Sequence, residues 1–294
     1  MIPKETIRKI RRIQITTSRK VTDVFAGQYQ SVFKGVGMEF DEVREYTPGD
    51  EIRSIDWNVT ARMGHPYIKK FVEERELTIM ILLDVSMSCR FGTRGRMKSE
   101  LAAELCSVIA FSAIKNNDKV GMLTFTDRVE KFVPPRKGMK HVLRVIREAL
   151  HNRPAGTHTD INKVLNHLNK VAHRRAIVFL VSDFYSDDFR KTLSITNKKH
   201  DVIAVTVEDP SEAELTNAGL LELRDAETGL RAVVDTSSPA VRDMFRRENR
   251  EIRERARRLF RSVNVDHIEL STDRSYVEPL IRFFRTREKR FIRR

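Results

Sequence analysis

The sequence predicts an α/β protein with a doubly wound, mostly parallel sheet and helices on both faces. Two observations predict this class: from Leu77 onward strand-like apolar runs alternate with amphipathic stretches, and those runs are almost continuously apolar. Parallel strands are joined by crossover connections, which are usually helices, so alternating strands and helices indicate a parallel sheet. Strands that are buried on both faces of a sheet are apolar along their whole length. We expect this domain to occupy residues 76–275.

Short apolar runs are expected to form the strands, and helical spacing of apolar residues predicts the helices between them. The expected strands cover residues 77–84, 119–127, 176–183, 201–207 and 265–271. The expected helices cover residues 98–115, 140–151, 161–173, 189–199, 239–260 and 277–287. Residues 220–235 have the pattern of a β-hairpin with Gly229 in its loop.

Three further segments lie outside this domain. Residues 1–26 form a basic segment, residues 27–75 a small β-rich appendage, and residues 276–294 a C-terminal helix with a basic tail. Within residues 2–13, isoleucines recur at helical spacing between Lys and Arg residues. Such a helix either docks on its own domain or makes peripheral contact with an anionic membrane.

The appendage is expected to contain short antiparallel strands within residues 29–45 and 67–73, and to pack against the main domain. The segment between them carries charged residues and the only tryptophan. Asp50, Arg53 and Asp56 are expected to form a buried ion network under Trp57. Alternatively, these residues and Arg62 form a surface that contacts a partner.

The net charge of +14 is concentrated at the two ends of the chain. Residues 1–35 contain eight Lys or Arg and two acids, and residues 239–294 contain 17 Lys or Arg and nine acids. Their net charges of +6 and +8 leave residues 36–238 neutral. No aromatic interleaving or nucleic-acid motif accompanies the basic ends, which argues against nucleic acid as the partner.

Cysteine usage and hydropathy predict a cytoplasmic protein. Cys89 and Cys106 are too few for a disulfide framework and lack C-x-x-C spacing. No apolar run reaches the ~18–20 residues that span a bilayer. The first residues also lack the apolar core of a secretory signal.

Polar groups follow two of the expected strands. Asp84, Ser86 and Ser88 come directly after the first, and alternate positions of an extended segment point the same way. Asp183 ends another strand, and Thr157 lies in a loop before a helix. In such sheets ligands bind beyond the carboxyl ends of the strands. Because carboxylates and hydroxyls are hard ligands, these residues predict a site for Mg²⁺ or Mn²⁺ and not for zinc.

This order of D-x-S-x-S, T-x-T and a strand-terminal Asp resembles the metal-ion-dependent adhesion site of von Willebrand factor A domains. The resemblance implies a von Willebrand factor A-like fold. It also implies that Asp84, Ser86, Ser88, Thr157 and Asp183 hold the metal. In such a site the Asp or Glu of a partner protein completes the metal's shell.

Two positions near the site carry separate expectations. The family usually has Gly after the last Asp, whereas Phe184 and Tyr185 follow Asp183 here. These bulky residues are expected to narrow access to the site, or to move Asp183 into a role through water. Thr159 is expected to cap the helix that begins near Asp160.

The chain also resembles the domain-of-unknown-function 58 family, bacterial proteins typically encoded beside MoxR-type AAA ATPases. The resemblance runs from about residue 27 to the C-terminus and is carried by GMEFDEVREYTPGDEIRSIDWNVTARMGHPYIKKFVEERE, GLLELRDAETG and STDRSYVEPLIRFFRTR. It implies no enzymatic activity. It implies an adaptor or assembly factor that works with a MoxR-type ATPase, a client protein offering Asp or Glu, or both.

Two other functions are left open by the sequence. The basic ends could bind nucleic acid or an acidic surface, and such binding would weaken steeply with salt and ignore EDTA. A metal-dependent hydrolase would need a general base, for which Asp183 and His158 are the candidates. The sequence lacks P-loop, dinucleotide-binding and nucleophile-elbow motifs. The expected function is therefore metal-dependent protein interaction.

Overall fold

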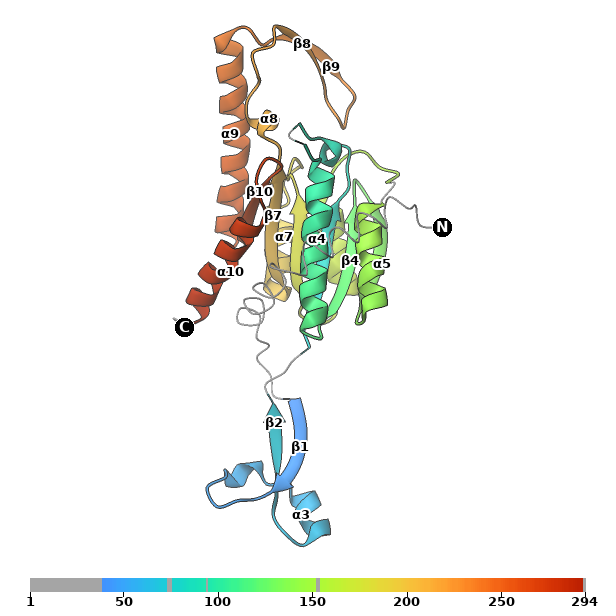
Figure 1. The fold of residues 1–294 in the computed structure, drawn as a ribbon, viewed down its shortest axis with the longest axis vertical. Helices are drawn as coiled ribbons and strands as arrows, with labels where there is room; N and C mark the ends of the chain where they lie inside the picture. The colour runs from blue at the N-terminus through green and yellow to red at the C-terminus, as the bar shows by residue number, and fades with distance from the viewer. Residues whose placement is uncertain (1–38, 73–75, 94, 152–153, 293–294) are drawn as a thin grey trace. The chain divides into compact units, whose positions relative to one another are not determined.

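Figure 1 shows the computed structural model, which describes residues 39–72, 76–93, 95–151 and 154–292. The chain divides into two compact units, a small one within residues 33–77 and a larger one that contains residues 78–294. The basic segment predicted at residues 1–26 lies outside the described residues.

A six-stranded sheet forms the centre of the larger unit, in the order β10-β7-β6-β3-β4-β5. Its strands are β3 (Thr78–Asp84), β4 (Lys119–Phe125), β5 (Val129–Arg136), β6 (Ile177–Ser182), β7 (Asp201–Glu208) and β10 (Asp266–Ser271). Neighbouring strands are parallel except for the pair β4 and β5. The predicted mostly parallel sheet is therefore confirmed.

Helices cover both faces of this sheet, and Figure 1 shows α4 and α5 in front of it. Met80 and Leu82 of β3 pack in one core cluster with residues of α6, α7 and α9. Ile79 and Ile81 point to the opposite face, and all four side chains are at most 1% exposed. Burial on both faces explains why the strands are apolar throughout. The helices and short turns of the larger unit are η3 (Ser88–Arg90), α4 (Lys98–Lys115), α5 (Met139–Leu150), α6 (Ile161–Val171), α7 (Arg190–Lys199), α8 (Pro210–Ala213), α9 (Pro239–Ser262) and α10 (Val277–Ile292).

The antiparallel strand at one edge of the sheet, β5, was not predicted from the sequence. This strand contains Pro134 and Pro135, which lack a backbone donor and are therefore confined to edges and bulges. The predicted hairpin is present as β8 (Leu220–Arg224) and β9 (Arg231–Asp235). Among the described residues, every helix is too short or too polar to cross a membrane.

The small unit is built on an antiparallel pair of strands, β1 (Glu39–Glu45) and β2 (Tyr67–Val72), as predicted. Between them the chain forms the short turn η2 (Ile52–Ser54) and the helix α3 (Trp57–Met63), which the sequence analysis did not predict. Asp56 caps α3 by accepting hydrogen bonds from two backbone amides, and Gly64 ends it in the left-handed conformation with φ 75°.

The predicted ion network under the tryptophan is wrong, because Trp57 is 67% exposed. Asp50 instead pairs with Arg44 at 2.6 Å, and Asp56 pairs with Lys69 at 3.2 Å. Hydrogen bonding by Arg44 lowers the pKa of Asp50 to about 2. These acids therefore fix local turns, and the alternative, a surface that contacts a partner, stays a prediction.

Candidate metal centre

The carboxyl ends of β3 and β6 bring the two predicted acids together. The two strands are parallel neighbours, and Asp84 ends β3 while Asp183 directly follows β6. The hydroxyl of Ser182, the last residue of β6, donates to Asp84 Oδ2 at 2.6 Å. The carboxylates of Asp84 and Asp183 and the thiol of Cys89 offer ligand atoms within 4.8 Å of one another, and all three residues are buried.

The residues after β3 form a tight turn around the Asp84 carboxylate. The backbone amide of Ser86 donates to Asp84 Oδ1 at 2.9 Å, and the hydroxyl oxygens of Ser86 and Ser88 are 3.0 Å apart. Ser86 is fully buried. The turn therefore brings together the carboxylate and both hydroxyls of the predicted D-x-S-x-S group.

A buried lysine, which the sequence analysis missed, lies beside these residues. The Lys98 side chain is 1% exposed, and its ammonium lies 2.9 Å from Asp183 Oδ2 and 2.5 Å from Glu212 Oε1. Burial acts to lower the pKa of Lys98, but the two carboxylates outweigh it and raise the pKa above its ordinary value. Glu212 belongs to a capping box with Asp209, for which the run D-P-S-E was the available sequence signal.

The site holds more buried carboxylate charge than cationic charge. Among the described residues, Lys98 is the cation that contacts the acids of the site, and its ammonium pairs with Asp183 and Glu212 but not with Asp84. Burial and the charge of Asp183 raise the pKa of Asp84 to about 7. A divalent cation would offset this excess, and the oxygen donors present are those that Mg²⁺ and Mn²⁺ prefer. The residues therefore fit a hard cation held by Asp84, Ser86 and their neighbours.

The cysteine in this cluster is a poor ligand for such a cation. Burial, together with the charges of Asp84 and Asp183, raises the pKa of the Cys89 thiol well above its ordinary value. The thiol therefore stays protonated at neutral pH, and the thiolate is the form that binds metals. Its sulfur accepts a hydrogen bond from the Ser86 hydroxyl at 3.8 Å.

The loop between α5 and α6 carries two threonines to the same edge. The carbonyl of Thr157 accepts a hydrogen bond from the Met87 amide at 3.1 Å, while its hydroxyl lies 2.9 Å from His158 Nδ1. The hydroxyl of Thr159 lies 3.3 Å from Asp84 Oδ2. Thr157 thus stays a predicted ligand, and Thr159 is a contact that the sequence analysis did not assign to the site.

The prediction that Thr159 caps a helix is wrong, and the expectation that bulky residues narrow access does not hold for Phe184. Asp160, and not Thr159, is the cap of α6. Phe184 does not narrow access, because its side chain is 6% exposed and packs edge-on against Phe260 at 4.9 Å between ring centroids. Its φ of 61° is the left-handed conformation that glycine favours, so packing of the ring offsets the backbone strain.

Glu130 of β5 anchors the loop that carries Thr157. Its carboxylate accepts hydrogen bonds from the backbone amides of Ala155 at 3.1 Å and Gly156 at 2.8 Å, and from the Thr126 hydroxyl at 2.7 Å. Because outer partners of a metal site orient its ligands, Glu130→Ala should weaken Mn²⁺ binding by about 10-fold. Isothermal titration calorimetry on the full chain measures this change.

The matched control for that experiment is Glu251→Ala, which removes an exposed acid of α9. The control should bind Mn²⁺ with the affinity of the wild-type protein. If folded Glu130→Ala also binds Mn²⁺ as tightly as the wild type, this loop does not contribute to the metal centre.

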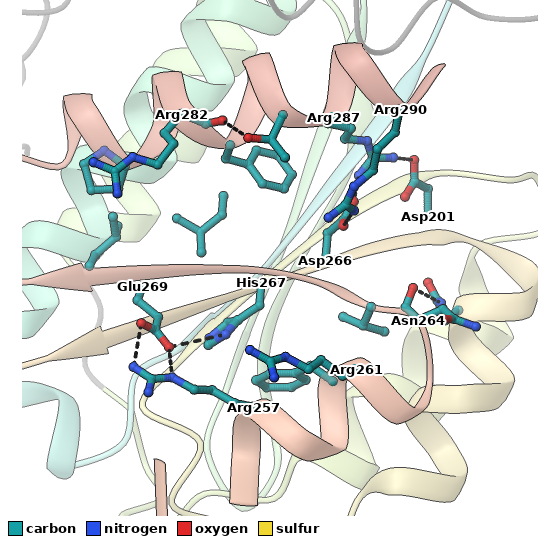
Figure 2. Close-up of a pocket in the computed structure, with 18 of the residues that line it drawn as sticks. Asp201, Arg257, Arg261, Asn264, Asp266, His267, Glu269, Arg282, Arg287 and Arg290 are labelled. Atoms are coloured by element: carbon teal, nitrogen blue, oxygen red, sulfur yellow. Dashed lines mark hydrogen bonds and ion pairs between the residues drawn. The ribbon is translucent and has the colours of Figure 1, made fainter. Parts of the chain in front are cut away.

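A groove of about 1800 Å³ lies along the edge strand β10, between α9 and α10 (Figure 2). Seven arginines and five acidic residues line it, and none of the five predicted ligands does. Arg257 pairs with Glu269, and Arg287 and Arg290 both pair with Asp266. These three arginines of the groove are therefore paired within the protein.

The fold and the site define an α/β protein with carboxylates and hydroxyls gathered at the carboxyl edge of a mostly parallel sheet. The family model "Protein of unknown function DUF58" matches residues 42–255, and the chain belongs to this family. The uncharacterized protein Rv1480 of Mycobacterium tuberculosis is 31% identical over 284 residues, which cover 95% of this chain and 89% of that protein. YeaD of Bacillus subtilis is 27% identical over 108 residues, 36% of this chain and 24% of YeaD.

Solved structures show weaker likenesses. BatB from Bacteroides thetaiotaomicron is 16% identical with a TM-score of 0.45, over 72% of this chain and 99% of that one. The SpRpn10 VWA domain is 12% identical with a TM-score of 0.41, over 70% of this chain and 94% of that one. Family membership rests on the family model and the sequence relatives, and it confirms the resemblance to the domain-of-unknown-function 58 family.

Proposed function

We propose that this chain is a non-enzymatic, metal-dependent protein-interaction module. The observation that carries the proposal is the buried pair Asp84 and Asp183 at the carboxyl edge of the sheet, with the Ser86 and Ser88 hydroxyls beside it and Lys98 as the one cationic neighbour among the described contacts. Mg²⁺ or Mn²⁺ bound there supplies a positive centre that attracts an external carboxylate.

The residues of the site have separate tasks under this proposal. Asp84 contributes the charged ligand, and the hydroxyls of Ser86, Ser88 and Thr157 add oxygens without cancelling the charge of the cation. Asp183 shares its carboxylate with Lys98 at 2.9 Å and so acts on the metal through water. The Asp or Glu of a partner protein then makes a charge-assisted contact at the open position.

Binding without turnover is proposed because both candidate general bases are engaged. His158 Nδ1 lies 2.9 Å from the Thr157 hydroxyl, and Asp183 accepts a hydrogen bond from the Lys98 ammonium. The proposed partner is a MoxR-type AAA ATPase or a client protein that offers Asp or Glu, and the family resemblance is its support. A reducing, cytoplasmic location is part of the proposal and agrees with the two free, buried cysteines.

The experiment that tests this function is affinity capture from a lysate of the source organism in Mg²⁺ and in EDTA. The wild-type chain should retain the same protein only in Mg²⁺, and Asp84→Asn should lose it. Asp187→Asn, which alters an exposed acid on the loop after β6, is the matched control and should behave as wild type. Capture of the same proteins by all variants in both buffers would place the contact away from the metal centre.

The groove between α9 and α10 supports a second candidate, binding of an acidic surface by the basic C-terminal segment. Arg257, Arg287 and Arg290 are occupied by ion pairs inside the protein, which makes this candidate the weaker one. The affinity of such binding should fall steeply between about 50 and 200 mM salt, as it does for contacts between basic side chains and phosphates. EDTA should leave the affinity unchanged.

A further inference from the structure

The hairpin of β8 and β9 extends over the end of the sheet where the metal centre lies (Figure 1). Its apolar side chains are poorly covered: Leu220 and Leu230 are 72% exposed and Val233 is 71% exposed. A two-stranded hairpin with so little packing is marginally stable on its own. The contacts that its tip makes with the rest of the unit therefore matter for where the hairpin lies.

The tip of the hairpin, residues 225–230, is a defined turn. The carboxylate of Asp225 accepts hydrogen bonds from the backbone amides of Glu227 at 2.9 Å and Thr228 at 2.7 Å. Gly229 has a φ of 74°, a conformation that glycine adopts without strain. Asp225 and Thr228 are exposed, whereas Glu227 is half-buried. The turn therefore directs the Glu227 side chain toward the body of the unit.

Glu227 contacts the residues of the candidate metal centre. The hydroxyl of Thr159 lies 3.1 Å from Glu227 Oε1 and 3.3 Å from Asp84 Oδ2, so it stands between the two carboxylates. Burial and the charge of Asp183 raise the pKa of Glu227, while hydrogen bonds from the Thr159 and Ser88 hydroxyls act to lower it. Glu227, carried by a distant segment of the chain, thus brings a further carboxylate to Asp84 and Asp183.

We propose that Glu227 is an intramolecular ligand of the metal centre, held by the hairpin where the carboxylate of a partner would bind. This inference rests on the proposed function. Without a cation, Glu227 adds to the repulsion between Asp84 and Asp183. Among the described residues, the hydroxyls of Thr159 and Ser88 are its hydrogen-bond partners. A divalent cation turns that repulsion into attraction, because Asp84 and Glu227 can bind it directly while Asp183 acts on it through water.

The hairpin would then act as a built-in competitor of the partner. A carboxylate tethered by a short segment has an effective concentration on the order of millimolar, which a free carboxylate group must exceed. A single Asp or Glu in solution would therefore not displace Glu227. The partner must also bind a neighbouring surface, so the hairpin makes the site selective for proteins over small carboxylates.

Two measurements on the full chain test this inference. The first is the Mn²⁺ dissociation constant of the wild type and of Glu227→Gln, measured by calorimetry. The second is hydrogen–deuterium exchange of residues 220–235 with and without Mg²⁺. The control is Glu222→Gln on the same hairpin, where Glu222 pairs with Arg231 at 3.0 Å and an exposed pair contributes little stability.

Glu227→Gln should weaken Mn²⁺ binding by about 10-fold or more. Mg²⁺ should slow exchange of the hairpin in the wild type and in Glu222→Gln, and leave it unchanged in Glu227→Gln. Equal Mn²⁺ affinity in all three proteins, with exchange that ignores Mg²⁺, would overturn the role of Glu227 and leave the metal-dependent function standing. Absence of Mn²⁺ binding in the wild type would overturn both proposals.

Discussion

Replacing Asp84 by asparagine should abolish binding of divalent cations and leave the protein folded. Asparagine keeps the shape of the side chain but removes the charge. Its amide oxygen can accept the hydrogen bond that the Ser86 amide donates to Asp84 Oδ1 at 2.9 Å. Its NH2 group takes the place of Oδ2, so the hydrogen bond with the Ser182 hydroxyl must reverse its direction. Loss of the charged ligand should raise the Mn²⁺ dissociation constant by at least about 100-fold, measured by calorimetry. Asp187→Asn should bind Mn²⁺ as the wild type does.

The stability of Asp84→Asn in the absence of metal shows whether its loss of metal binding is due to misfolding. The pKa of Asp84 is about 7 in the folded protein, against an ordinary value of 3.8, so the folded state holds a proton that the unfolded chain releases. Protonated Asp84 therefore contributes its full share to the free energy of unfolding below about pH 4, and this contribution is lost as the pH rises toward 7. Asparagine has no proton to release. In EDTA at pH 8, Asp84→Asn should therefore be at least as stable to urea as the wild type.

Metal should act on the two proteins differently. Mg²⁺ should raise the melting temperature of the wild type, and more strongly at pH 8 than at pH 6, because the cation binds the ionised carboxylate. It should leave the melting temperature of Asp84→Asn unchanged. A variant that unfolds in EDTA at pH 8, or one that still binds Mn²⁺ tightly, would contradict the role assigned to Asp84.

The sequence predicts those parts of the fold and site that depend on short stretches of chain. Strands buried on both faces are apolar throughout, so β3 and β6 are recognisable, and each ends at or next to an acid. The parallel arrangement then places Asp84 and Asp183 at one edge without any further information. The strand β5 could not be predicted in this way, because Pro134 and Pro135 interrupt the apolar pattern of a strand. Proline is tolerated there because β5 lies at the edge of the sheet.

The residues that the sequence analysis missed reach the site from distant segments. From the sequence, Lys98 is indistinguishable from any polar residue at the start of a helix. Likewise, Glu212 has the pattern of a helix cap and Glu227 that of an exposed turn. Each has an ordinary local role, and only the tertiary structure brings all three to the acids. A charged residue that is buried by tertiary contacts has no periodic signal in the sequence.

Replacing Lys98 by methionine should cause the largest loss of stability of the substitutions considered. The side chain is 1% exposed, and its ammonium contacts Asp183 at 2.9 Å and Glu212 at 2.5 Å. Methionine fills similar space but leaves two carboxylates with no cation in a buried environment. Removal of one partner of a buried ion pair costs about 3–5 kcal/mol in the free energy of unfolding. Urea denaturation followed by circular dichroism, in EDTA at pH 7.5, measures this loss.

Two companion variants identify the cause of that loss. Lys98→Met combined with Glu212→Gln should be more stable than Lys98→Met alone, because one of the two unpaired charges is gone. Lys191→Met, on the exposed face of α7, should change the free energy of unfolding by no more than about 0.5 kcal/mol. A loss below about 1 kcal/mol in Lys98→Met would mean that the carboxylates find other partners or take up protons.

Mg²⁺ should restore part of the stability that Lys98→Met loses. In the wild type, Lys98 balances Asp183, while Asp84 is left to the metal. When the ammonium is removed, none of the described ion pairs supplies a cation to Asp183. Binding of the metal should therefore stabilise Lys98→Met more than the wild type. Equal stabilisation of the two proteins by Mg²⁺ would mean that the lysine and the metal act on separate carboxylates. A larger effect on the variant would show that they share Asp183.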